Sequence, residues 1–246
     1  MVELTVLGSA SPYARPGNPC SGYLVRHGGT ALWMDAGPGT LAELQRHVRP
    51  DRLDGIWISH LHADHVSDLL TAYYALRYAD LEPSGPVPLY GPPGTAERLR
   101  HFLSNQGPSP VEDAFDVHEL YDGRTDRVGG LTVESRAVEH GFPAFGARIG
   151  TGVAGDGLLA YSGDTGPCPA LVELADGASL LLCEADLDTP RRRPGRAPDS
   201  GAGGRVRPRG GCPKAGADPR GTLSAARGRG RTGPAGLRWA DALRGA

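Results

Sequence analysis

The residues best suited to chemistry are three imidazoles and one carboxylate within a single short segment, SHLHADH at residues 59–65: His60, His62, Asp64 and His65. This segment follows a short apolar run and precedes a helical pattern, so it occupies a strand-to-helix loop. Side chains two positions apart on an extended segment face the same way, so His60 and His62 can bind one ion. Asp64 and His65 begin the helical turn and suit a second ion. Imidazole and carboxylate groups at this spacing favour a zinc-like metal site over a solvated polar loop.

The elements that must position this loop are strands and helices along residues 2–183. Alternating or short apolar runs predict the strands, and apolar residues at helical spacing predict the helices. The predicted strands are residues 2–7, 21–26, 30–34, 55–58, 88–90, 115–120, 131–138, 145–149, 158–161 and 180–183. The predicted helices are residues 41–48, 66–79, 95–103 and 168–174. The histidine-rich segment therefore follows the fourth predicted strand.

The pattern HxHxDH at residues 60–65 resembles the metal-binding motif of the metallo-β-lactamase superfamily. Other motifs follow in the order of that family, and the resemblance extends from Met1 to about Asp188. These motifs are DAGPG at residues 35–39, EHG at 139–141, SGDT at 162–165 and CEA at 183–185. The chain is most similar to the ribonuclease Z-like phosphodiesterases, which include bacterial cyclic-nucleotide phosphodiesterases. The resemblance implies an αββα sandwich, with two mixed sheets back to back, helices outside and the ligands at strand ends.

The resemblance also implies two divalent metal ions, with zinc expected and manganese or iron as alternatives. The expected ligands of the first ion are His60, His62 and His140. The expected ligands of the second ion are Asp64, His65 and Asp164, of which Asp164 bridges both ions. We expect the second site to be the weaker one.

Asp64 and Glu184 are the residues that we assign to catalysis. In ribonuclease Z-like enzymes a glutamate at the position of Glu184 holds a histidine that protonates the leaving group, but no histidine follows His140 in this chain. Asp35, in the DxGxG-like turn, is expected to support the metal loop without binding metal itself. Asp68 stands where the ribonucleases usually have glycine, and this difference argues against transfer RNA as the substrate.

Length and composition limit the size of the fold and the compartment of the protein. A chain of 246 residues can form one large domain or two small ones with a sizeable core. No apolar run approaches the roughly 18 residues of a membrane span, and the N-terminal segment MVELTVLG lacks a basic, apolar leader. Cys20, Cys168, Cys183 and Cys212 form no CxxC pair or disulfide framework. We therefore expect a cytoplasmic protein with reduced thiols and no membrane contact.

The formal net charge of −2 conceals two oppositely charged parts. Residues 191–246 carry 13 Arg and one Lys against three Asp, a net charge of +11. Residues 1–190 carry 12 basic and 25 acidic side chains, a net charge of −13. An acidic body is a poor binder of long nucleic acid, which needs Lys and Arg on its phosphates. The partners that we expect are a small-molecule substrate and, in the assembly, a second copy of the chain as a homodimer.

Three functional classes remain open. The first is a phosphodiesterase for a small phosphodiester such as a cyclic nucleotide, using a hydroxide that bridges two ions roughly 3.5–4 Å apart. The second is a lactone, thioester or β-lactam hydrolase, because the same hydroxide attacks a carbonyl carbon. The third is a metal-binding protein with crippled activity, which the absence of any histidine after His140 favours. The family motifs favour the phosphodiesterase.

The composition changes abruptly after residue 189. We interpret residues 1–189 as the hydrolase domain and residues 190–246 as an Arg/Gly/Pro/Ala-rich tail that is too poor in apolar residues to order itself. Reading residues 197–220 one base later, with synonymous codons chosen freely, permits HLTPEQAGEYARGAAARRLVLTH. This string supplies a histidine to pair with Glu184 and a final histidine for the second metal. We therefore interpret the tail as a frameshift product that replaces the last helix and strand; the alternative is a basic, flexible tail that binds acidic partners.

Backbone amides of residues 190–246 are expected to exchange hydrogen at the rate of an unstructured chain, because this composition buries too little apolar surface. Hydrogen-exchange mass spectrometry measures this directly, and protected amides would contradict the prediction. The coding DNA tests the origin of the tail. A single-base insertion or deletion between about residues 186 and 197 is expected relative to close relatives, and an unbroken common reading frame would refute the frameshift.

Overall fold

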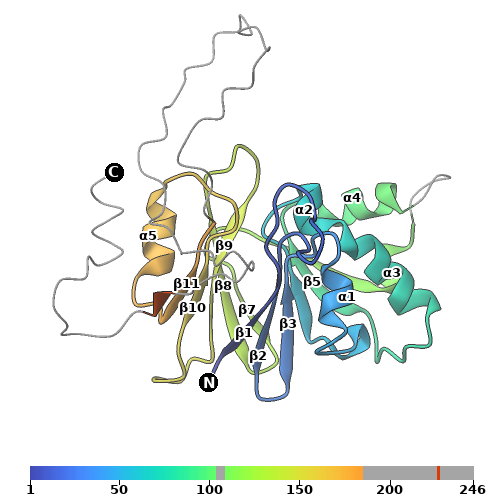
Figure 1. Ribbon diagram of the computed structural model, residues 1–246, viewed down its shortest axis with the longest axis horizontal. Helices are drawn as coiled ribbons and strands as arrows, with labels where there is room; N and C mark the ends of the chain where they lie inside the picture. The colour runs from blue at the N-terminus through green and yellow to red at the C-terminus, as the bar shows by residue number, and fades with distance from the viewer. Residues whose placement is uncertain (104–108, 185–225, 228–246) are drawn as a thin grey trace, which may run out of the picture.

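The computed structural model describes residues 1–103, 109–184 and 226–227. They form two six-stranded sheets packed face to face, with helices on the outer faces (Figure 1). The strand order is β1-β2-β3-β4-β5-β6 in the first sheet and β12-β11-β10-β9-β8-β7 in the second. Both sheets contain parallel and antiparallel pairs. The αββα sandwich predicted from the sequence is therefore confirmed.

The first sheet and its helices come from the N-terminal half of the chain. Its strands are β1 (Glu3–Gly8), β2 (Gly22–His27), β3 (Thr30–Met34), β4 (Gly55–Trp57), β5 (Val87–Gly91) and β6 (Phe115–Glu119). Its helices are α1 (Thr40–Leu44), α2 (Ala63–Val66), α3 (Asp68–Tyr78) and α4 (Thr95–Phe102), with short 3-10 helices at Pro50–Arg52 and Val111–Asp113. Strands β3 to β6 are parallel neighbours, so the C-terminal ends of these strands lie at one edge of the sheet.

The second sheet is mainly antiparallel. Its elements are β7 (Thr125–Val128), β8 (Leu131–Ala137), β9 (Phe145–Gly150), β10 (Leu159–Tyr161), α5 (Pro169–Ala175), β11 (Leu180–Leu182) and β12 (Ala226–Arg227). The short strand β12 pairs with β11 and lies in the segment that the sequence predicts to be unstructured. Residues 185–225 and 228–246 lie outside the described residues, so the domain boundary at 189, the disordered tail and the frameshift stay predictions.

Strand β3 illustrates why the molecule has two apolar cores. All five of its residues are buried. Trp33 packs with Ile56 in the core beneath the helices, whereas Leu32 and Met34 pack with Val133 in the core between the sheets. Successive side chains of a strand face opposite ways, so a strand covered on both faces needs an uninterrupted apolar run. The run Thr30–Met34, which the sequence predicts as one strand of a hairpin, comes close to this requirement, with Thr30 as its one polar residue.

A hydrogen bond joins the two sheets inside their apolar interface. The indole Nε1 of Trp57, on β4, donates to Ser135 Oγ, on β8, over 3.1 Å, and both side chains are buried. Trp57 precedes by two residues the segment 59–65, which we call the histidine loop. The packing between the sheets therefore determines the point from which the histidine loop starts.

The helical region after the histidine loop differs from the prediction. The single helix expected at residues 66–79 is divided at Ser67 into α2 and α3. Asp68, at the start of α3, accepts the backbone N–H of Leu41 at the start of α1 over 2.7 Å. Burial raises the pKa of the Asp68 carboxyl group, although backbone hydrogen bonds from this turn favour its charged form. Asp68, which stands where the ribonucleases usually have glycine, thus anchors α1.

In the described part of the chain, no helix has the length and apolarity needed to cross a membrane.

Replacement of Trp57 by alanine is expected to lower the free energy of unfolding by about 3–5 kcal/mol. The substitution leaves a cavity between the sheets and removes the partner of the Ser135 hydroxyl. Urea denaturation followed by circular dichroism measures the change. Tyr78→Ala is the control, because this tyrosine is 68% exposed and its loss should cost about 0.5 kcal/mol or less. Equal destabilisation by both variants would contradict the packing described above.

Candidate metal centre

The predicted site residues come from chain segments that reach the same edge of the sandwich. The histidine loop follows β4, His140 lies in the connection from β8 to β9, and Asp164 follows β10. Strands β8 and β10 are both antiparallel to β9, so they end on the same side of their sheet. Figure 1 shows these connections above one edge of the two sheets. The fold therefore brings together side chains from both sheets.

Four of the predicted ligands converge on one point. The ligand atoms of His60, His62, His140 and Asp164 all lie within 4.8 Å of one another. His62 Nδ1 lies 3.0 Å from His60 Nε2 and 3.2 Å from His140 Nε2. Nitrogen ligands at their usual distance from a tetrahedral zinc ion are roughly 3.3 Å apart. Three imidazoles and one carboxylate with this spacing form a donor set that fits a divalent ion of the zinc type.

Asp164 lies between this group and the remaining predicted ligands. Its Oδ2 is 3.9 Å from His60 Nε2 and 4.0 Å from His140 Nε2. Its Oδ1 is 3.4 Å from His65 Nε2, and Asp64 Oδ2 lies 3.9 Å from that same His65 nitrogen. One carboxylate oxygen of Asp164 therefore faces each group. This is the arrangement that a carboxylate bridging two metal ions requires.

Asp35 is fully buried beside the histidine loop and accepts four hydrogen bonds. The donors are the Ser59 N–H (2.7 Å), the Ser59 hydroxyl (2.9 Å), His65 Nδ1 (2.8 Å) and the Tyr161 hydroxyl (2.6 Å). Because Asp35 holds the Nδ1 side of His65, the ring presents Nε2 to Asp164. Asp35 has a positive φ of 53°, a conformation that aspartate tolerates better than most residues. The supporting position expected for Asp35 agrees with these contacts.

The electrostatics of the cluster shift pKa values in opposite directions. Burial and the neighbouring charge of His65 lower the pKa of His60 to about 3, and burial lowers the pKa of His140. Burial also opposes protonation of His65, but Asp35 and Asp164 outweigh it and raise its pKa to about 10. Burial alone would raise the pKa of Asp164, whereas its hydrogen bond to His65 and the charge of that ring lower it. At neutral pH His60 and His140 are therefore neutral imidazoles, the form that binds metal, whereas His65 carries a proton that an ion would have to displace.

Glu184 lies beside the turn that carries Asp164. Its Oε1 accepts the backbone N–H of Thr165, and its own N–H donates to Ser162 Oγ over 3.0 Å. These two contacts hold the SGDT turn on both sides of Asp164. The catalytic role expected for Glu184 stays a prediction, because the chain segment that follows it, residues 185–225, lies outside the described residues.

The sequence does not predict two further side chains at this site. Ser11 Oγ donates to Asp64 Oδ2 over 3.2 Å. The ring of Phe142, 40% exposed, stands edge-on to His62 and His140 at centroid distances of 4.3 and 5.0 Å. Phe142 directly follows the EHG motif, which is the one sequence signal that could have pointed to it. Neither residue is a usual metal ligand, so ligand spacing could not reveal them.

Comparison with known proteins gives a consistent family assignment. A model of the β-lactamase superfamily domain matches residues 30–208. The uncharacterized protein Rv1339 of Mycobacterium tuberculosis is 43% identical over 196 residues, which are 78% of this chain and 71% of that protein. Ribonuclease Z of Mycobacterium marinum is 34% identical over 203 residues, which are 74% of this chain and 70% of the relative. Both the family model and the relatives cover most of the chain.

Solved structures share the fold at lower sequence identity. The metallo-β-lactamase fold protein YhfI from Bacillus subtilis superposes with a TM-score of 0.63 at 21% identity, covering 73% of this chain and 70% of YhfI. The short form of human tRNase Z superposes with a TM-score of 0.61 at 24% identity, covering 76% of this chain and 79% of that one. The resemblance first indicated by the HxHxDH pattern is thus confirmed by sequence and structure. This chain belongs to the metallo-β-lactamase superfamily.

Proposed function

We propose that this protein is a metal-dependent phosphodiesterase that cleaves a small phosphodiester such as a cyclic nucleotide. The observation that carries the proposal is the position of Asp164, whose two oxygens face separate groups of candidate ligands. A pair of ions suits phosphodiester cleavage, because charge develops on both the attacking and the leaving oxygen. A relative named ribonuclease Z and a structural neighbour described as a diphosphatase of the PhnP family support a phosphorus-centred substrate.

The candidate ligands would form two metal sites that share Asp164. The first ion would be held by His60, His62, His140 and Asp164. The second would be held by Asp64, His65 and Asp164. When bound, such ions lower the pKa of a water molecule and neutralise charge on the phosphoryl oxygens.

The protein groups around these ligands hold them in place. Asp35 orients His65 through its Nδ1, and Ser11 holds one oxygen of Asp64. The Glu184 carboxylate accepts a hydrogen bond from the backbone N–H of Thr165, the residue after Asp164. A site whose ligands are oriented in advance loses less free energy on ordering when an ion and a substrate bind.

A small substrate suits the surroundings of the site better than a long nucleic acid. Residues 1–190 carry a net charge of −13, which repels a long phosphate backbone. The half-exposed ring of Phe142 beside His62 and His140 offers a surface on which a nucleobase can stack. These two features together favour a nucleotide-sized phosphodiester.

A second candidate is hydrolysis of a thioester or lactone. Among these the thioester is favoured by the lack of any histidine after His140 in the sequence, because a thiolate leaving group needs no proton donor, whereas the alkoxide released from a lactone or a phosphodiester does. The observed contact of Glu184 with Thr165 is compatible with both candidates. Assays of the same protein with phosphodiester, thioester and lactone substrates distinguish the two candidates.

His62→Ala is expected to weaken zinc binding by more than about 100-fold, which exceeds the usual effect of changing a residue that only supports a ligand. Metal content per chain after dialysis, measured by atomic emission, gives the result. His118→Ala is a matched control, because His118 pairs with Asp116 over 3.1 Å and stacks on Tyr90 at 5.1 Å, outside the cluster. Undiminished zinc in His62→Ala would remove His62 from the ligand set.

Bis-p-nitrophenyl phosphate and a cyclic nucleotide are expected to be hydrolysed, and Asp164→Ala should reduce both rates by about 1,000-fold or more because a bridging ligand is lost. Asp116→Ala serves as the control for removal of a carboxylate. Rates should be compared between this chain and a version carrying HLTPEQAGEYARGAAARRLVLTH from position 197, which is expected to be the faster. Turnover of a thioester or lactone without phosphodiester cleavage in either version would overturn the proposal.

A further inference from the structure

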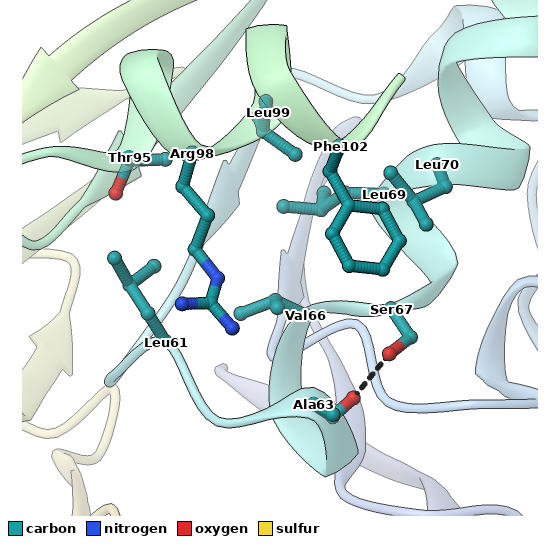
Figure 2. A pocket seen from close by; sticks show the side chains of 10 residues that line it. All are labelled: Leu61, Ala63, Val66, Ser67, Leu69, Leu70, Thr95, Arg98, Leu99 and Phe102. Atoms are coloured by element: carbon teal, nitrogen blue, oxygen red, sulfur yellow. Dashed lines mark hydrogen bonds between the residues drawn. The ribbon is translucent and has the colours of Figure 1, made fainter. Parts of the chain in front are cut away.

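A pocket lies on the opposite side of the histidine loop from the candidate metal ligands. Its walls are Leu61 of the loop, helix α2, the start of α3, and α4 (Figure 2). Leu61 stands between His60 and His62, and on an extended segment its side chain points away from theirs. It packs instead against the core beneath the helices. The pocket and the candidate metal centre therefore share a stretch of backbone but no side chain.

The pocket is lined mainly by apolar side chains. Leu69 and Leu99 are buried at its floor, while Leu70 is partly buried and Phe102 is 61% exposed at its edge. The enclosed part of the pocket measures about 30 Å³, and the rest is open to solvent. Placing an apolar group against this surface removes apolar area from water, which is favourable, so the pocket is suited to an apolar ligand group.

Arg98 gives the pocket a charge. Its side chain extends from α4 across the hollow, toward Leu61 and Val66 (Figure 2). Among the described residues no carboxylate lies within ion-pair distance of Arg98, whereas Arg100 of the same helix pairs with Glu112. A guanidinium without a carboxylate partner, next to an apolar hollow, is complementary to an anion with an apolar body.

The other polar side chains of the wall already have backbone partners. The Ser67 hydroxyl donates to the Ala63 carbonyl over 2.6 Å, the bond drawn in Figure 2. The Thr95 hydroxyl donates to the Pro92 carbonyl, also over 2.6 Å. Recognition of a polar group in this pocket therefore depends on Arg98.

We propose that this pocket binds a small amphiphilic anion. Its single carboxylate or phosphate group pairs with Arg98, and its alkyl or aromatic body lies against Leu69, Leu70 and Leu99. Leu61 and Ala63 form part of the wall, so the bound anion touches the backbone that carries the candidate ligands His60 and His62. The inference rests on the pocket alone and is independent of the reaction proposed above.

Isothermal titration calorimetry of the full chain with octanoate and octyl phosphate, both below their micelle concentrations, tests the proposal. Excess inorganic phosphate is present throughout, because it competes for the metal centre without supplying an apolar body. Both anions are expected to bind saturably, and octanoate should bind more tightly than acetate, because its alkyl chain removes apolar surface of the pocket from water. Octylammonium should not bind measurably. Absence of saturable binding by both anions, or equal binding of octylammonium, would overturn the proposal.

Arg98→Gln should weaken octanoate and octyl phosphate binding by about tenfold or more, because a charge-assisted hydrogen bond is lost. Arg127→Gln removes the same charge from β7 of the second sheet and should leave the affinity unchanged. Leu70→Gln should weaken binding and reduce the dependence on chain length, since it makes the apolar wall polar. Arg98 is exposed, so its replacement is expected to leave the unfolding temperature unchanged. Binding by Arg98→Gln as tight as by the unaltered chain places the anion elsewhere and refutes the assignment.

Discussion

The buried carboxylate of Asp35 is the point at which strand β3, the histidine loop and the second sheet are joined. Its two oxygens accept hydrogen bonds from Ser59, His65 and Tyr161. Hydrogen bonds to a charged group contribute about 1.5–3 kcal/mol each, whereas a buried charge that loses its partners costs several kcal/mol. The network is therefore stable only when all the donors are in place. This condition links the geometry of the histidine loop to the packing of both sheets.

Strand β10 supplies two parts of the site at once. Its last residue, Tyr161, donates to Asp35 and packs against Tyr23 and Trp57 at centroid distances of 5.3 and 6.2 Å in the core between the sheets. Three residues later the chain reaches Asp164, which faces both groups of imidazoles. Because the aromatic core fixes β10, it also fixes the position of the Asp164 carboxylate. The electrostatic partner of this carboxylate, His65, is held by the same Asp35.

The histidine loop has two faces with different chemistry. His60 and His62 face the candidate metal centre, and Leu61 between them faces the helices. The polar face collects imidazoles and carboxylates, while the apolar face borders a pocket whose charged member is Arg98. An extended loop segment makes this possible, because alternate side chains point to opposite sides. Helices α2 and α3 separate at Ser67, so that Asp68 can reach the start of α1.

The sequence by itself determined the residue types of the site, most of the strands and helices, and the family to which the chain belongs, but it did not predict β7 (Thr125–Val128) or the short β12 (Ala226–Arg227). These features are local: ligand types at alternate positions, apolar runs of strand length and short motifs at strand ends. Only the tertiary structure decided which of these groups meet, because His62 and His140 are 78 residues apart, Ser11 and Asp64 are 53 apart, and Asp35 and Tyr161 are 126 apart. The positions of Phe142, of the break at Ser67 and of Arg98 over its pocket follow from the packing of segments distant in sequence. Local spacing encodes the direction of a side chain along its own strand or helix, whereas its neighbours across space are set by how the sheets and helices pack.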